Sequence, residues 1–425
     1  MEQVAKSSSV SSRRISKGVE LSRVFPVDIA NREAFMLEHE PSRITVEDFR
    51  QLLMSCVLSG ASDVTIQSDM QPRAEIHGIL YRATRKPWSP SEVDMVLMEV
   101  YGGSNARTEI NGMKVLDFSY ELNLEDGSKQ RFRVNAIGIY GRDGKGVEIT
   151  LRALPVKTPD LAMVKLSNIE LAALKPKDGI IIIAGATGSG KSTTMAAITR
   201  SQLEDVDHPV KIVDIQAPIE YTFRDVTNAV RGSSSTIGQS EVHKHIPNFA
   251  EGVRAALRRK PNIINVGEAR DFETIHAALE ASLTGHLVYT TTHAGNVPDA
   301  VRRLLSVFPA NERDARAFDL ISAMRFLMVQ HLVPRIDTPG RIPVREYLRF
   351  TPRLKEKLVA ADINEWPSML IDEVHGRIEN IGEEDMCQSL LQVVKPLYSK
   401  GMISKNDAFV LGGLAAVDTP PQGEL

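Results

Sequence analysis

The sequence of 425 residues has only two cysteines, no long apolar run and no large excess of charge. Cys56 and Cys387 lie far apart without CxxC spacing, which argues against a disulfide framework or a zinc site and favours two buried thiols. The longest apolar stretch, at 179–186, is too short to span a membrane. The first residues lack the apolar core of a secretory signal. We therefore expect a cytoplasmic protein without an integral membrane segment, which reaches the inner membrane only through partners.

The balance of charge limits the possible partners. The formal net charge is −3, so the chain has no global attraction for nucleic acid, and we expect no direct nucleic-acid binding. Hydrophobic residues make up 42% and charged residues 25% of the chain, as in ordinary soluble proteins. The length allows two or three domains with cores of their own.

The first part of the chain divides into an extension and a small domain. Residues 1–44 are polar, rich in serine and arginine and without sustained periodicity, which predicts a disordered extension. Residues 45–155 are expected to form an α+β domain on a mostly antiparallel sheet, with helices at 44–58 and 91–101. Its strands are expected at 63–67, 73–83, 117–127, 130–140 and 147–154.

The prolines at positions 155, 159 and 176 place an interdomain link near 155–160. Beyond it, strands alternate with helices through 156–335, which predicts an α/β domain with a parallel sheet covered on both faces. Residues 297–332 and 383–412 are expected to be helical, and 341–351 to be a strand pair or an extended link. The region 336–425 is thus predicted to be mostly helical.

A phosphate-binding motif follows the first strand of this α/β domain. Residues 185–192 read GATGSGKS and match GxxxxGK[ST] between a predicted strand and a predicted helix. Backbone N–H groups of such a loop cradle phosphate, the lysine reaches the β- and γ-phosphates, and the following serine coordinates Mg²⁺. A glycine-rich structural turn is the alternative. The residues expected to bind nucleotide are Gly185, Thr187, Gly188, Ser189, Gly190, Lys191, Ser192 and Thr193.

Two glutamates and two histidines follow or flank other predicted strands of the sheet. Glu220 comes after the strand ending near Gln216, Glu268 follows NIINVG, and GHLVYTTTHAGN offers His286 and His293. Each alone would be an ordinary loop or structural residue. Because ligand chemistry gathers at the carboxyl ends of parallel strands, we expect all four at one edge of the sheet, where glutamates can organise Mg²⁺ and water.

Taken in order, these motifs resemble those of the secretion ATPases, the family that powers type IV pilus retraction and type II and type IV secretion. The resemblance covers roughly 45–350. It is carried by ASDVTIQSDMQPRAEIHG (61–78), QRFRVNAIG (130–138), VEITLRALP (147–155), GATGSGKSTT (185–194), IQAPIEY (215–221), the run 254–294 and SVFPANER (306–313). It implies a PAS-like N-terminal domain, a RecA-like P-loop domain, ATP and Mg²⁺ as cofactors, and a homo-hexamer at the cytoplasmic face of a membrane-embedded secretion, conjugation or pilus complex.

The resemblance also implies residue roles. Gly267 stands where many P-loop nucleotidases carry an aspartate, but a strand ending in Gly-Glu is the family's own form. Glu268 becomes the Walker B glutamate beside the Mg²⁺ held by Ser192, and Glu220 the acid of the Asp box. His286 and His293 match the His box. Arginines of the N-terminal domain reach the phosphates in relatives, and the matching candidates are Arg131, Arg133 and Arg152, with an ordinary surface or structural ion pair as the alternative for each.

One departure from the family pattern narrows the choice of branch. Pilus ATPases carry a Glu-Asp pair before the proline of the Asp box, where this chain has Gln216-Ala217. Because it lacks this acidic pair, the chain resembles the type IVB branch of Dot/Icm-like secretion and IncI-like conjugation ATPases. We therefore expect a type IVB-like motor, with a pilus retraction motor or an ATP-binding scaffold with little hydrolysis as the alternatives.

Overall fold

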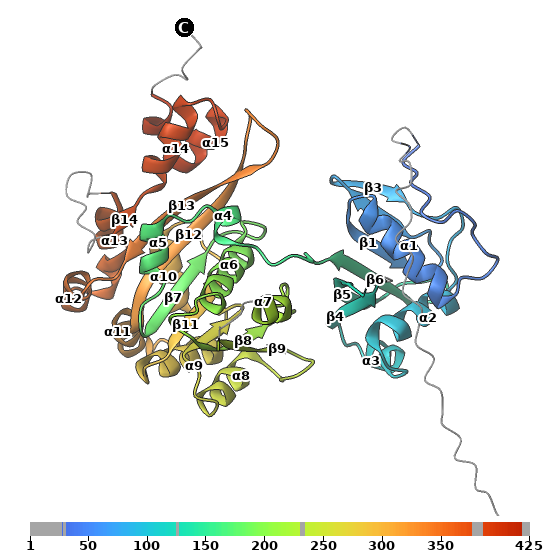
Figure 1. Ribbon diagram of the computed structural model, residues 1–425, viewed down its shortest axis with the longest axis horizontal. Coiled ribbons are helices and arrows are strands. Elements are labelled where there is room, and N and C mark those ends of the chain that lie inside the picture. Colours follow the sequence, from blue (N-terminus) through green and yellow to red (C-terminus); the bar gives the residue numbers. More distant parts are fainter. Residues whose placement is uncertain (1–27, 29–30, 125–126, 230–233, 376–385, 419–425) are drawn as a thin grey trace, which may run out of the picture. The chain divides into compact units, whose positions relative to one another are not determined.

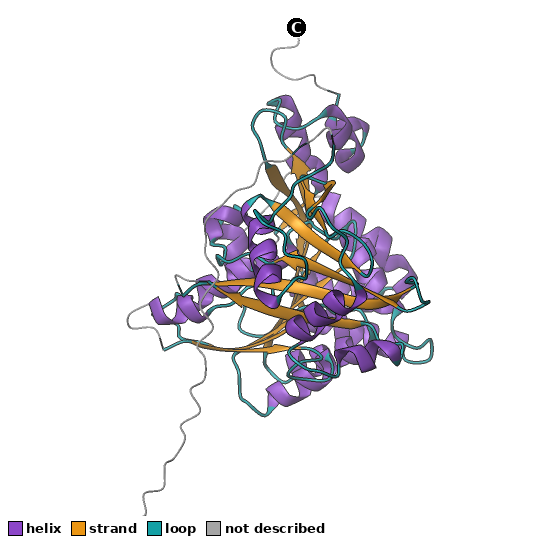
Figure 2. Cartoon of the chain, turned by 90° about the vertical axis from the view of Figure 1, so that its right-hand side faces the viewer, coloured by secondary structure: helices purple, strands orange, loops and turns teal. Residues whose placement is uncertain are grey.

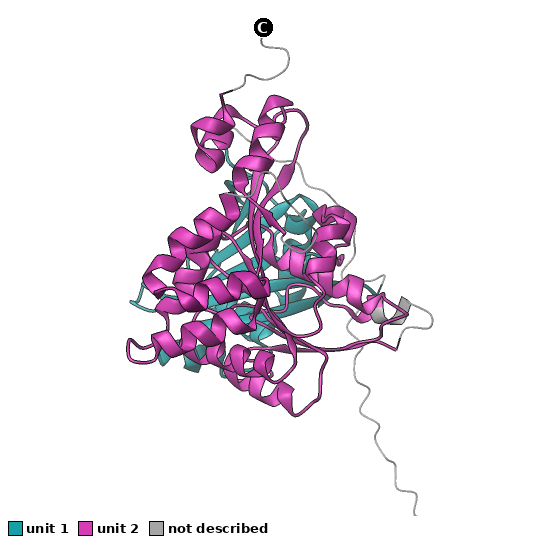
Figure 3. Cartoon of the chain, turned by 90° about the vertical axis from the view of Figure 1, so that its left-hand side faces the viewer, with its two compact units in different colours: residues 1–156 teal, residues 157–425 magenta. Residues whose placement is uncertain are grey.

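The computed structural model describes residues 28, 31–124, 127–229, 234–375 and 386–418. The chain divides into two compact units, an N-terminal unit (Met1–Val156) and a C-terminal unit (Lys157–Leu425) (Figure 3). Both units combine helices with strands, and Figure 2 colours the two kinds of element along the chain. Within the described residues, no helix is both long and apolar enough to cross a bilayer.

The N-terminal unit is built on an antiparallel sheet of strand order β3-β2-β1-β6-β5-β4. Residues on alternate positions of β5, such as Phe132 and Val134, are buried in the same core cluster as residues of the unit's helices, so one face of the sheet carries the core. The described elements are α1 (Val46–Leu58), β1 (Ala61–Gln67), β2 (Arg73–Ile76), β3 (Ile79–Arg82), α2 (Pro90–Tyr101), α3 (Ala106–Asn111), β4 (Leu116–Asn123), β5 (Lys129–Ile139) and β6 (Gly146–Ala153).

Two expectations for this unit need correction. The single strand expected at 73–83 is a hairpin, because His77 and Gly78 both take positive φ and turn the chain between β2 and β3. The extension predicted for 1–44 is too long, since Ala34 and Met36 are fully buried and their N–H groups donate to carbonyls of residues 82 and 83. The run that packs there is too short to show a period. Residues 1–27, 29 and 30 lie outside the described residues.

The C-terminal unit contains an eight-stranded sheet of order β14-β13-β12-β7-β11-β10-β8-β9 (Figure 1). The strands from β12 to β9 are parallel, and β13 and β14 are antiparallel additions at one end. The described strands are β7 (Gly179–Ala184), β8 (Lys211–Gln216), β9 (Thr236–Glu241), β10 (Ile263–Val266), β11 (Leu287–Thr292), β12 (Met324–Pro334), β13 (Arg341–Arg349) and β14 (Cys387–Gln388).

Helices cover both faces of this sheet, because all residues of β7 are buried and successive residues pack into two different core clusters. Ile180 and Ile182 belong to a core cluster with α8, α9, α10 and α11, whereas Ile181 and Ile183 belong to a second cluster with α6 and α7. The helices are α4 (Leu161–Val164), α5 (Asn168–Ala173), α6 (Lys191–Leu203), α7 (Arg224–Ala229), α8 (Phe249–Leu257), α9 (Phe272–Leu283), α10 (Val297–Ser306), α11 (Arg313–Ala323), α12 (Pro352–Ala360), α13 (Trp366–His375), α14 (Leu390–Ser399) and α15 (Lys405–Gly412), with short 3₁₀ turns at Ile363–Glu365 and Leu414–Ala416.

The C-terminal half of the sheet differs from the sequence prediction. The prediction of helix for 297–332 is wrong at its end, because β12 pairs in parallel with β7 at the centre of the sheet. An apolar run such as MRFLMVQHLV fits a buried strand as well as a helix. Since β13 pairs with β12, the sheet also continues past the domain boundary expected at 335, into the region predicted to be mostly helical.

Candidate active site

The phosphate loop joins the end of β7 to the start of α6. Gly185, Gly188 and Gly190 have φ of 148°, 76° and 84°, a backbone region that other residues rarely adopt. A Cβ on Gly185 or Gly190 would meet atoms of Gln330 on β12, whereas one on Gly188 would have nothing within 4 Å. The loop therefore rests against β12 and is open at Gly188. At the start of α6, the first-turn N–H groups have no partner within the helix, which makes this end attractive to anions.

Lys191 begins α6 directly after the loop, within electrostatic range of two acids. Its Nζ donates to the carbonyl oxygens of Gly185 and Ala186, at 2.9 and 2.8 Å. Burial lowers the pKa of Lys191, and the nearby carboxylates of Glu268 and Glu220 act against this shift. Both glutamates thus act on the charge of Lys191, which is consistent with their predicted position at one edge of the sheet.

Glu268 also lies close to His293, which the sequence analysis expects at the same edge of the sheet. His293 Nε2 is 3.5 Å from Glu268 Oε1, and Arg270 is 3.7 Å from the other carboxylate oxygen. The turn after β10 is fixed to β11 because Thr291 Oγ1 donates to the Gly267 carbonyl. About 29% of the Glu268 side chain is exposed, so its carboxylate remains within reach of solvent and of a ligand.

Oxygen ligands suited to Mg²⁺ surround a small cavity beside the loop. Its lining includes Ser192, Asp214, Gln216, Glu220 and Asn265. Among the described residues, no group of three or more His, Cys, Asp or Glu side chains forms a metal cage. Mg²⁺ is usually held through one or two protein ligands, waters and substrate phosphates, so the serine hydroxyl and nearby glutamates fit this ion.

The same cavity contains an acid that the motifs do not identify. Asp214 on β8 is 2% exposed, and it accepts hydrogen bonds from Gln216 Nε2 (2.6 Å) and Gln239 Nε2 (2.8 Å). Burial raises the pKa of Asp214, and these amides partly oppose the shift. The only sequence signal was an aspartate inside the otherwise apolar run IVDI. Gln216, which replaces the acid expected from pilus ATPases, is thus the partner of a buried carboxylate.

We expect the substitution Gln216→Glu to destabilise the protein rather than restore a missing acid. It would place two carboxyl groups where a 2.6 Å hydrogen bond now joins Gln216 to Asp214. The free energy of unfolding should fall by about 1–3 kcal/mol at neutral pH. Because repulsion raises the folded-state pKa of the pair above the unfolded values, the penalty is full at neutral pH and fades as the pH falls. Denaturant unfolding at neutral pH and at about pH 5 measures it.

The matched control reverses the same hydrogen bond. In the double variant Asp214→Asn/Gln216→Glu, the new asparagine can donate to the new glutamate, so most of the lost stability should return. A single Gln216→Glu variant as stable as the wild type at neutral pH would show that the two side chains do not share a desolvated site.

His286 does not lie where the sequence prediction placed it. Because β11 runs parallel to β7 with Leu287 opposite Gly179, His286 sits at the amino-terminal edge of the sheet. The phosphate loop follows the opposite ends of these strands, about 20 Å away for a strand of six residues. The ring Nδ1 of His286 lies 3.1 Å from the Ala281 carbonyl oxygen near the end of α9. The prediction for His286 is wrong because this residue precedes β11, whereas His293 follows it. Only His293 lies at the carboxyl ends of the strands.

The three candidate arginines belong to the N-terminal unit, on the outer face of its sheet. Each pairs with a carboxylate of that sheet: Arg131 with Glu121 at 3.3 Å, Arg133 with Asp117 at 3.2 Å and Arg152 with Asp63 at 2.8 Å. Arg133 and Arg152 are direct cross-strand neighbours, and both are well exposed, whereas Arg131 is buried. Arg133 and Arg152 can therefore exchange their ion-pair partners more freely than the buried Arg131 can.

Comparison with known proteins finds similarity to ATPases of secretion systems and type IV pili. The family described as "Type II/IV secretion system protein" matches residues 39–364. The type IV pilus retraction ATPase PilT of Pseudomonas aeruginosa is 29% identical, over 85% of this chain and 97% of the relative. The crystal structure of the Legionella pneumophila ATPase DotB aligns with a TM-score of 0.77 and 36% identity, over 88% of this chain and 97% of DotB. The structure of the pilus retraction motor PilT with bound ADP aligns with a TM-score of 0.68 and 27% identity, over 90% of this chain and 99% of PilT.

Proposed function

The chain belongs to the type II/IV secretion system protein family and is a secretion ATPase, and on this premise we propose that it is a Mg²⁺-dependent ring motor of a type IVB-like secretion or conjugation machine. One observation carries the proposal: a phosphate loop at the edge of a parallel sheet, whose lysine donates to the loop carbonyls and feels the charge of two glutamates, one of which lines a cavity together with Ser192. Substrate positioning and electrostatic stabilisation are most of what phosphoryl transfer needs from a protein.

The residues of the site divide this work among themselves. The backbone of 185–190 and the ammonium of Lys191 bind the phosphates, and Ser192 and Glu268 are the residues that would hold Mg²⁺. When bound, Mg²⁺ neutralises charge on the phosphates. Glu220, which lines the cavity beside Ser192, orients or deprotonates the attacking water. His293 holds the carboxylate of Glu268 in place.

The motor property is part of the same proposal. We assign a homo-hexameric ring, a PAS-like character of the N-terminal unit, and a position at the cytoplasmic face of a membrane-embedded complex. Arg133 or Arg152, exposed on the N-terminal unit, would approach the phosphates during the cycle, and Arg131 is the weaker candidate because it is buried. An arginine supplied by a mobile domain couples hydrolysis to movement of that domain.

The type IVB assignment is supported by Gln216-Ala217 and by the similarity to DotB. A pilus retraction motor with the same chemistry is the second candidate, favoured by the similarity to nearly the whole length of PilT. The genomic neighbourhood discriminates between them, because pilin and pilus-assembly genes beside this gene would contradict the secretion assignment.

We expect the purified full-length protein to hydrolyse ATP only when Mg²⁺ is present, and to sediment as a hexamer when ATP is added. Phosphate release with and without a chelator measures the first property, and analytical ultracentrifugation measures the second. A protein that forms rings on ATP but releases no phosphate would instead support the scaffold alternative.

A further inference from the structure

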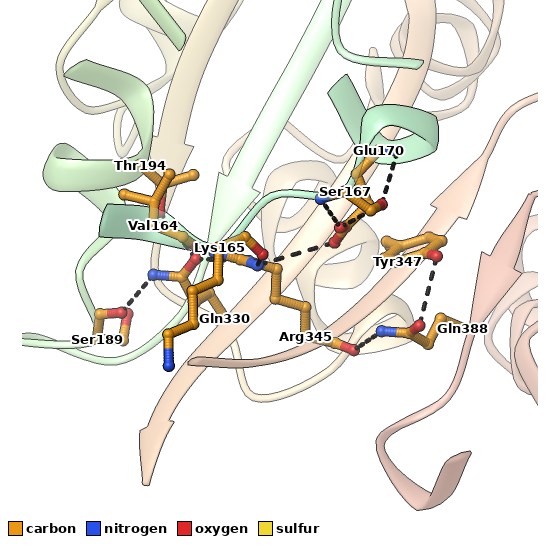
Figure 4. Close-up of polar contacts among 10 residues, drawn as sticks. All are labelled: Val164, Lys165, Ser167, Glu170, Ser189, Thr194, Gln330, Arg345, Tyr347 and Gln388. Carbon is orange, nitrogen blue, oxygen red and sulfur yellow. Dashed lines mark hydrogen bonds and ion pairs between the residues drawn. The ribbon is translucent and has the colours of Figure 1, made fainter. Parts of the chain in front are cut away.

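A buried glutamine on the neighbouring strand holds the phosphate loop. Gln330 on β12 is 2% exposed, and its Nε2 donates to the carbonyl oxygen of Ser189 at 2.7 Å. Its Oε1 accepts from Thr194 Oγ1 on α6 and from Arg345 Nε on β13, both at 2.9 Å (Figure 4). One side chain therefore joins the loop, the helix that follows it and two strands of the sheet.

The bond to Ser189 sets the direction of a phosphate-binding group. In a trans peptide the C=O and the following N–H point in opposite directions, so fixing the Ser189 carbonyl turns the Gly190 N–H away from Gln330. The N–H groups at this point of a phosphate loop are those that bind phosphate. The fit on the Gln330 side is close, because a Cβ on Gly190 would lie 3.0 Å from Gln330 Nε2.

Arg345 fixes the orientation of the glutamine amide. A guanidinium only donates hydrogen bonds, so Oε1 of Gln330 must face it and Nε2 must face Ser189. Arg345 is itself 5% exposed and donates to the carbonyl oxygens of Val164 and, at 3.0 Å, of Lys165. The carboxylate of Glu170 lies 3.9 Å from it and balances part of its charge. The guanidinium thus links the glutamine to the segment 161–173, which follows the link between the two units.

We propose that Gln330 is a positioning residue for the phosphate loop, and that Arg345 holds its amide so that the Gly190 N–H faces the β-phosphate of a bound nucleotide. This inference rests on the proposed function of the loop. It adds that nucleotide affinity depends on a pair of side chains that do not reach the phosphate, and hence on the placement of α4 and α5.

The decisive experiment removes the donor in two ways, by Gln330→Glu and by Gln330→Met. The glutamate still accepts from Thr194 and Arg345 but cannot donate to Ser189, whereas methionine has a similar length and no charge. We expect both variants to bind ADP about tenfold more weakly, which corresponds to one lost hydrogen bond that orients a ligand-binding group. KM for ATP should rise more than kcat falls. Fluorescent-nucleotide titration and thermal unfolding are measured on the same full-length preparations.

Gln388→Met is the matched control. Gln388 on β14 donates to the main-chain oxygen of Arg345 at 2.9 Å, so this substitution removes a glutamine donor from the same network without touching the loop. It should lower the melting temperature but leave ADP affinity unchanged. The inference would be overturned if Gln330→Met bound ADP as tightly as the wild type, including the case in which only Gln330→Glu weakened binding. It would also be overturned if Gln388→Met weakened ADP binding as much as the Gln330 variants did. A wild-type protein that binds no nucleotide would overturn the proposed function as well.

The role of Arg345 is tested by a double-mutant cycle with Arg345→Lys. Lysine keeps a charge near Glu170 but lacks the fork that reaches Gln330 and the two carbonyls together. If Arg345 acts through Gln330, Arg345→Lys should weaken ADP binding in the wild type and add little in the Gln330→Met background. Additive losses would show that the two residues act independently and would overturn this part of the inference.

Discussion

Replacing Lys191 by alanine is expected to reduce ATP turnover at least about 100-fold, the scale seen when one preorganised donor to a developing charge is removed. Its ammonium is the cation that the loop itself carries to the phosphates, and in this structure it donates to two loop carbonyls. Because burial already disfavours the charged form of Lys191, as its lowered pKa indicates, its removal should cost little stability. Steady-state phosphate release, with unfolding curves of the same preparations, measures both effects.

Lys211→Ala is the control for this variant. The Lys211 ammonium also donates to a backbone carbonyl, that of Arg259, but the residue starts β8 at the opposite end of a parallel strand from the phosphate loop. Its turnover should match that of the wild type. Turnover in Lys191→Ala as fast as in the wild type would place the phosphate site elsewhere and remove the basis of the proposed mechanism.

The phosphate loop was accessible to sequence reasoning because local rules determine it. The run GIIIIAG can only be a short buried element, and three glycines with a lysine and a serine at fixed spacing define the turn that follows. The glutamates Glu220 and Glu268 could be placed as well, because parallel strands end at one edge. In each case the chemistry lies within a few residues of the signal.

The parts that sequence reasoning missed depend on partners far along the chain. Whether MRFLMVQHLV forms a helix or a strand is decided by β7, about 145 positions earlier in the chain. This strand pairs with β11 on one side, and its other side is available for pairing with MRFLMVQHLV. The contact of Gln330 with Ser189 spans 141 positions and has no motif. His286 was misplaced because its spacing to the strand was considered without its direction. Asp214 was overlooked because, of its two amide partners, only Gln216 is near in sequence, and Gln239 comes from β9, a strand that was not predicted.

The glutamates of the site should separate into two roles when each is changed to glutamine. Glu220→Gln and Glu268→Gln are both expected to keep nucleotide binding and to lose about 10²–10⁴-fold in turnover, the range for a general base. Only Glu268→Gln should raise the Mg²⁺ concentration needed for half-maximal rate. Both carboxylates raise the pKa of Lys191 against the larger effect of burial, and because Glu268 has the greater influence of the two, its loss lowers that pKa more. Nucleotide binding, which needs the charged lysine, should therefore be lost at a lower pH in Glu268→Gln than in the wild type.

Glu273→Gln, an exposed change in the first turn of α9, controls for the loss of one negative charge near this edge and should behave as the wild type in all three measurements. If Glu220→Gln shifted the Mg²⁺ requirement and Glu268→Gln did not, the two assignments would have to be exchanged, with Glu268 and its partner His293 acting on the water. If neither variant lost turnover while Lys191→Ala did, the catalytic base would have to come from elsewhere, because Lys191 binds phosphate but cannot orient the attacking water. The pair of variants thus tests the division of labour separately from the existence of the nucleotide site.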